Sequence, residues 1–178
     1  MPVQKDRRRI LKLFSVLLAY PDEQLLQSLD EVRVELWALS QYPAISPCNE
    51  FVKLLGSVPL ISMQERYTNI FDLRAETCLN LTYHEHGENP ERGVALANFR
   101  QLYKTSGYEQ TDSELPDYLP IVLEFLSLCA DEVCSAVLRR HVAHLEVLAS
   151  RLKALGDPYQ VVMEALCIIC RQIVTKGV

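Results

Sequence analysis

Residues 114–120 have the sequence Glu-Leu-Pro-Asp-Tyr-Leu-Pro, and an apolar run, Ile-Val-Leu-Glu-Phe-Leu-Ser-Leu-Cys, continues from them to residue 129. Proline fixes its own φ and keeps the residue before it out of the helical region. Leu115 and Leu119 are therefore expected to be extended, and a helix is expected to begin at Pro120. This helix is apolar on nearly all sides, which indicates a central place in the fold.

The same stretch is acidic. It contains Glu114, Asp117 and Glu124, and no Lys or Arg occurs between Thr105 and Leu138. A run of charges by itself usually marks a solvated face. Here the carboxylates flank a stiff proline turn that also carries an aromatic residue, Tyr118. We therefore expect this turn to form part of a binding surface.

Helical patterns cover the remainder of the chain. Apolar residues recur at helical spacing, and helix caps, prolines and glycines separate the segments. Leu79, Leu81 and Tyr83 alternate as in a strand, but no second strand is evident, so that segment is predicted to be helical or irregular. The sequence predicts an all-α fold, a single-domain bundle of roughly eight to ten helices over residues 1–178. The expected helices cover residues 11–18, 22–39, 51–56, 59–71, 91–105, 120–129, 131–155 (with a break midway) and 158 onward.

Composition is that of an ordinary globular protein. The 178 residues are 49% hydrophobic and 23% charged, and no apolar run approaches the length of about 20 residues that a membrane span needs. A net charge of −5 argues against binding to nucleic acid. The six cysteines lie within apolar runs, as at Cys167 and Cys170, and are predicted to be reduced thiols in the core of a cytoplasmic protein.

The N-terminal segment Arg7-Arg8-Arg9 precedes an apolar run and so resembles a twin-arginine export signal. However, the run stops at Pro21-Asp22-Glu23, and no small-x-small cleavage site follows. The better interpretation is an amphipathic first helix with a basic flank.

His84 and His86 flank Glu85 and are the residues most suggestive of a metal site. Residues two apart point to opposite sides of a helix, and zinc needs at least one further ligand. The motif His-Glu-x-x-His is absent. We therefore expect no metal and no other cofactor, and assign the histidines to hydrogen bonding or to contact with a partner.

Six segments stand out in order along the chain, namely Leu17-Leu18-x-Tyr20-Pro21-Asp22, Tyr67-x-x-x-Phe71-Asp72-Leu73, Leu81-Thr82-Tyr83-His84-Glu85-His86-Gly87-Glu88, Arg92-Gly93-x-Ala95-Leu96, Tyr103-x-x-x-Gly107, and Glu114-Leu115-Pro116-Asp117 through Leu123-Glu124-Phe125. Together they resemble the NarJ-type chaperones, the delta subunits that assemble the molybdenum cofactor of nitrate reductase, within the wider group that includes TorD and DmsD. The resemblance spans about residues 10–159. One departure matters, because Tyr118 stands where many members have His after Pro-Asp.

This resemblance implies an all-helical cytoplasmic chaperone with no catalysis of its own. Such a protein binds the N-terminal segment of the apo catalytic (alpha) subunit of a respiratory nitrate reductase. It holds the enzyme for insertion of the molybdenum cofactor, before the enzyme docks at the membrane. The expected partner is a basic amphipathic segment, with no nucleic acid and no insertion into the membrane. The chaperone itself is expected to be a monomer or a weak homodimer.

For the binding site, the sequence suggests an acidic rim beside an apolar groove. The rim is assigned to Glu114, Asp117 and Tyr118. Two other classes stay open, namely a helical adaptor that binds a folded partner and a metal-dependent enzyme that uses His84, Glu85 and His86. Other residues assigned to the peptide site are Tyr67, Phe71, Tyr83, His84 and His86.

Overall fold

The structure, a computed structural model, describes residues 3–111 and 113–176, and in these ranges it contains ten α-helices and no β-sheet. The predicted all-α class is confirmed. The helices are α1 (Arg7–Leu18), α2 (Glu23–Gln27), α3 (Leu29–Ala38), α4 (Cys48–Ser57), α5 (Leu60–Tyr67), α6 (Leu81–His86), α7 (Glu91–Thr105), α8 (Leu119–Leu128), α9 (Asp131–Leu155) and α10 (Tyr159–Lys176).

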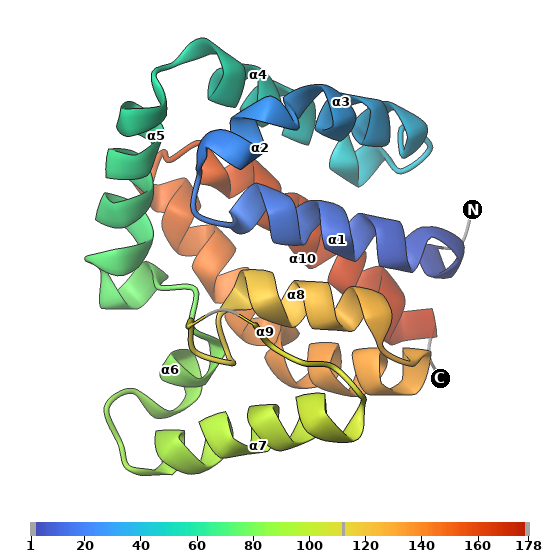
Figure 1. The fold of residues 1–178 in the computed structure, drawn as a ribbon, viewed down its shortest axis with the longest axis vertical. Helices are drawn as coiled ribbons and strands as arrows, with labels where there is room; N and C mark the ends of the chain where they lie inside the picture. Colours follow the sequence, from blue (N-terminus) through green and yellow to red (C-terminus); the bar gives the residue numbers. More distant parts are fainter. Residues whose placement is uncertain (1–2, 112, 177–178) are drawn as a thin grey trace.

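The packing is built on two long helix pairs. α1 lies along α8, and α9 lies along α10, while α5 and α7 lie at the periphery (Figure 1). Leu123 and Phe125 of α8 are fully buried, as the apolar run from residue 120 predicted. Among the described residues, no helix is both long enough and apolar enough to cross a membrane.

Local sequence signals set some of the helix ends. The Asp22 carboxylate accepts a hydrogen bond from the backbone N–H of Leu25 at 2.8 Å, so it caps α2 as expected. The single helix predicted for residues 22–39 is divided at Ser28, which separates α2 from α3. The predicted break in the helix over residues 131–155 does not occur, because α9 is continuous.

Gly156 ends α9 in the left-handed conformation, with φ 63°, and it provides a matched test with Gly93 inside α7. A Cβ at either position meets no atom within 4 Å, so only the backbone conformation differs. We expect Gly156→Ala to lower the free energy of unfolding by about 1 kcal/mol. Gly93→Ala should raise it by about 0.5–1 kcal/mol, because alanine favours a helix interior. Urea unfolding of both variants measures these changes. Equal changes in the free energy of unfolding for the two variants would contradict the prediction.

Arg7 anchors the start of α1 in the interior. Its side chain is 1% exposed and donates hydrogen bonds to the backbone carbonyls of Leu126 and Cys129, the latter at 2.8 Å. Its Nε lies 2.9 Å from the carboxylate of Asp131, at the start of α9. The expectation of an amphipathic first helix is confirmed, and one of its three arginines joins α1 to the end of α8.

A short backbone pairing connects the segment before α6 to the proline turn before α8. The N–H of Leu119 donates to the carbonyl of Leu79 at 2.8 Å, and the N–H of Leu81 donates to the carbonyl of Asp117 at 3.1 Å. This isolated antiparallel bridge explains the strand-like alternation in the sequence. The pairing partner is the proline turn itself, which fixes the turn against α6.

Candidate functional site

Asp117 lies inside the protein, with 0% of its surface exposed. One carboxylate oxygen accepts hydrogen bonds from the backbone N–H of Thr82 at 3.0 Å and from its hydroxyl at 2.6 Å, and the other accepts from the Asn80 amide at 3.0 Å. The Arg92 guanidinium of α7 lies 4.0 Å away. The prediction that Asp117 forms part of a charged rim is therefore wrong. Asp117 caps the start of α6 and positions the turn.

Tyr67 and Phe71 are also buried, so they do not line a groove directly. Their rings pack together with centroids 4.8 Å apart, and both contact Tyr159 of α10. The Tyr67 hydroxyl donates to the backbone carbonyl of Leu18 at 2.9 Å and is hydrogen-bonded to the hydroxyl of Tyr118. Tyr67 thus holds the Tyr118 hydroxyl, and Phe71 packs against Tyr67.

Tyr118 is half-buried, and exposed apolar and acidic side chains lie around it. Tyr20, 45% exposed, packs edge-on against Tyr67 with ring centroids 5.3 Å apart. Tyr20 also lines a hollow of about 240 Å³ together with Ile61, which is 60% exposed, and Glu65. We define the Tyr118 surface as Tyr20, Ile61, Glu65, Asp72, Glu114 and Tyr118.

The Tyr118 surface carries negative charge close to the phenol. Burial, followed by the charges of Glu114 and Asp72, raises the pKa of Tyr118 to about 12, and the hydrogen bond between Tyr118 and Tyr67 acts to lower it. Glu114, Glu65 and Asp72 are exposed, as an acidic rim requires. Glu114 also lines a larger hollow of about 650 Å³ beneath the end of α7, together with Arg100 and Lys104.

Tyr83 and His84 on α6 lie apart from this aromatic cluster and have partners of their own. The Arg92 guanidinium stands 5.3 Å from the centre of the Tyr83 ring. His84 Nε2 is 2.8 Å from the backbone carbonyl of Cys78, and burial lowers the pKa of His84. The structure thus assigns local roles to both residues, and His84 and His86 do not face a common ligand position.

Glu85, between these histidines, is the centre of a second cluster. Its carboxylate contacts Arg140 at 2.9 and 3.2 Å and lies 3.2 Å from Nδ1 of His141 and 3.9 Å from Nδ1 of His144. His86 Nε2 lies 3.4 Å from it. Although burial acts to raise it, the pKa of Glu85 is lowered, chiefly by the hydrogen bond from Arg140. Burial lowers the pKa of His141 to about 4.

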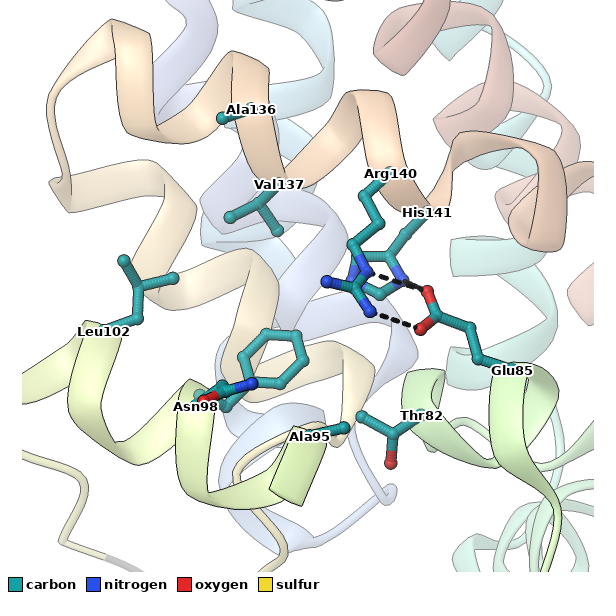
Figure 2. A pocket seen from close by; sticks show the side chains of 10 residues that line it. Thr82, Glu85, Ala95, Asn98, Leu102, Ala136, Val137, Arg140 and His141 are labelled. Atoms are coloured by element: carbon teal, nitrogen blue, oxygen red, sulfur yellow. Dashed lines mark hydrogen bonds and ion pairs between the residues drawn. The ribbon is translucent and has the colours of Figure 1, made fainter. Parts of the chain in front are cut away.

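Sequence reasoning missed His141 and His144. The spacing His-x-x-His places both rings on one face of a helix, so the signal was present on α9. Figure 2 shows the Glu85 carboxylate extending from α6 toward Arg140 and His141. The three residues with the geometry of a metal-binding group are Glu85, His141 and His144. Glu85 and His141 also line a cavity of about 290 Å³ between α6, α7 and α9.

Another groove, of about 780 Å³, runs between α1, α3 and α8. Leu13, Val32 and Leu128 contribute its apolar floor. Its charges pair across it, since Arg9 bonds to Glu35 at 2.8 Å and Lys12 bonds to Glu124. This groove therefore presents little net charge to a basic ligand, in contrast to the Tyr118 surface.

Comparison with solved structures finds another protein with this fold. The structure superposes on a protein of Archaeoglobus fulgidus described as a redox enzyme maturation protein, with a TM-score of 0.61. The match covers 95% of this chain and 94% of that one at 23% sequence identity, so it shows the fold alone. This chain therefore has the all-helical fold of that protein.

The sequence comparisons then give the family. Residues 22–161 match the nitrate reductase delta subunit family. The chain is 30% identical over 161 residues to a nitrate reductase molybdenum cofactor assembly chaperone, NarJ, of Bacillus subtilis. This alignment covers 90% of this chain and 88% of that protein. It is 30% identical to NarJ of Escherichia coli over 88% of this chain and 67% of that protein. The chain belongs to the nitrate reductase delta subunit family, and the predicted resemblance is confirmed.

Proposed function

We propose that the chain is a dedicated cytoplasmic chaperone for the apo catalytic subunit of a nitrate reductase. It binds the N-terminal segment of that subunit and holds it while the molybdenum cofactor is inserted, before the enzyme docks at the membrane. The names of both NarJ relatives support assembly of this cofactor as the task. Membership in a family of assembly chaperones supports binding without catalysis.

The observation that carries the binding proposal is the Tyr118 surface. Exposed apolar side chains, Tyr20 and Ile61, lie beside carboxylates, and this combination suits a basic amphipathic segment. Asp72 and Glu65 form no ion pair within the described part of the chain. Their charge is therefore available to a partner.

The free energies expected for ionic and for apolar contacts indicate what each contributes to peptide binding. An exposed ion pair contributes at most about 1 kcal/mol, so the carboxylates mainly orient the segment and speed its capture. The apolar contacts must supply most of the affinity. A segment that folds as it binds loses part of this free energy to ordering, which makes release after cofactor insertion feasible.

We expect the double variant Tyr20→Ala, Ile61→Ala to bind the N-terminal peptide of the catalytic subunit at least about tenfold more weakly, measured by calorimetry. Both side chains are exposed, so the fold should be retained. The matched control is Val34→Ala, Trp37→Ala, which removes two exposed apolar side chains from α3. If only the control variant bound the peptide more weakly, the proposed binding site at the Tyr118 surface would be contradicted. Binding of a catalytic subunit that lacks the segment would favour a helical adaptor instead.

A further inference from the structure

Three histidine ring nitrogens converge on the carboxylate of Glu85. His141 Nδ1 and His144 Nδ1 come from successive turns of α9, and His86 Nε2 comes from the residue after Glu85. All three nitrogens are shielded from solvent, and none has a hydrogen-bond partner. His141 is held in place, since it is 4% exposed and stacks on Phe99 with ring centroids 5.8 Å apart.

Such a group of unpartnered nitrogens calls for an explanation. A buried polar atom without a partner costs about 1–3 kcal/mol, and most proteins leave very few. The two Nδ1 atoms lie near Glu85 Oε1, but neither makes a hydrogen bond with it. A cation between the rings and the carboxylate would contact both Nδ1 atoms and Glu85 Oε1 at once.

We propose that Glu85, His141 and His144 bind one divalent transition-metal ion. Two imidazoles and a carboxylate suit zinc, iron(II), cobalt or nickel, whereas calcium and magnesium prefer oxygen ligands alone. The three ligand atoms lie within 4.8 Å of one another. Ligand atoms about 2.1 Å from a tetrahedral ion are about 3.4 Å apart, so side-chain rotations of modest size close the site.

Arg140 competes with the metal for the Glu85 carboxylate. Its guanidinium bonds to both oxygens and adds a positive charge to the site. The Arg140 side chain is 61% exposed, so it can turn toward solvent when an ion binds. Removing this charge should strengthen binding of a cation, because like charges repel at short range. Arg140 therefore sets the metal affinity without being a ligand.

A bound ion would join α6 to α9 at the edge of the cavity that Glu85 and His141 line (Figure 2). An ion held by three protein ligands keeps one position open, and the cavity provides room there for a water molecule or a small ligand. Binding to the folded state alone also stabilises it by mass action, so the melting temperature should rise with metal concentration.

The test is calorimetric titration of the metal-free full chain with Zn²⁺, repeated with Co²⁺ followed by visible absorption. We expect one ion per chain, and at least about tenfold weaker binding for Glu85→Gln and for His144→Ala. Arg140→Gln should bind more tightly than the wild type. The matched control is His84→Ala, on the same helix, which should bind like the wild type because His84 is engaged with Cys78.

Failure of the wild type to bind either ion at micromolar concentration would overturn the proposal. Binding that Glu85→Gln and His144→Ala leave unchanged would also overturn it, since the ion would then be adventitious, held by thiols or histidines elsewhere. His141 is not used in the test because its burial makes unfolding a second cause of any loss. Peptide binding by the metal-free chain tests the chaperone proposal separately, so the two can fail independently.

Discussion

Replacing Asp117 with alanine is expected to lower the free energy of unfolding by about 3–5 kcal/mol, measured by urea denaturation at neutral pH. The substitution leaves both buried donors of Thr82, and the partly buried Asn80 amide, without their acceptor. It also leaves the Arg92 guanidinium without its nearby counter-charge. Asp117→Asn should cost less, about 1–3 kcal/mol, because one amide oxygen still accepts.

The matched control for Asp117 is Glu114→Gln, three residues earlier in the same turn. Glu114 is exposed, so its replacement should change the free energy of unfolding by less than about 0.5 kcal/mol. If Asp117→Ala were as stable as the control, the buried carboxylate would not hold the proline turn to α6, and the position assigned to Tyr118 would lose its support.

Replacing Arg7 with alanine should have an effect of similar size, a loss of about 3–5 kcal/mol. The side chain joins three elements, because it bonds to the carbonyls of Leu126 and Cys129 at the end of α8 and to Asp131 of α9. Its removal leaves two buried acceptors unpaired. Arg7→Lys should recover only part of the loss, since an ammonium group lacks the planar fork of donors.

Arg8 provides the control for Arg7, since it is adjacent and exposed. Arg8→Ala should change stability by less than about 0.5 kcal/mol. Both variants are compared by thermal unfolding and urea denaturation. Equal melting temperatures for Arg7→Ala and Arg8→Ala would show that Arg7 does not stabilise the junction of α1, α8 and α9.

Those features that depend on neighbouring residues could be predicted from the sequence. The Asp22 cap, the Gly156 stop and the helix after Pro120 follow from local backbone chemistry, and the structure has all three. The apolar character of α8 predicted its burial correctly for the same reason. The all-α class follows from the sum of these local signals.

Features that depend on distant contacts could not be predicted in this way. The charge pattern of the sequence suggested that Asp117 lies on an acidic rim. Its partners Asn80 and Thr82 are more than 30 residues away in the sequence, so the pattern could not reveal that the carboxylate is buried. The same holds for the cluster at Glu85, whose histidine partners on α9 meet it only in the folded chain. Tyr118 is half-buried in the same turn, and the Tyr118 surface as a binding site stays a proposal.

Amide hydrogen exchange of the chain, with and without the N-terminal peptide of the catalytic subunit, tests the proposed binding most directly. The proposal predicts that the peptide slows exchange in residues 60–67 of α5 and in residues 114–119, which carry part of the Tyr118 surface. Protection confined to α1 and α3, around the groove at Leu13 and Val32, would contradict it, as would the absence of any protection.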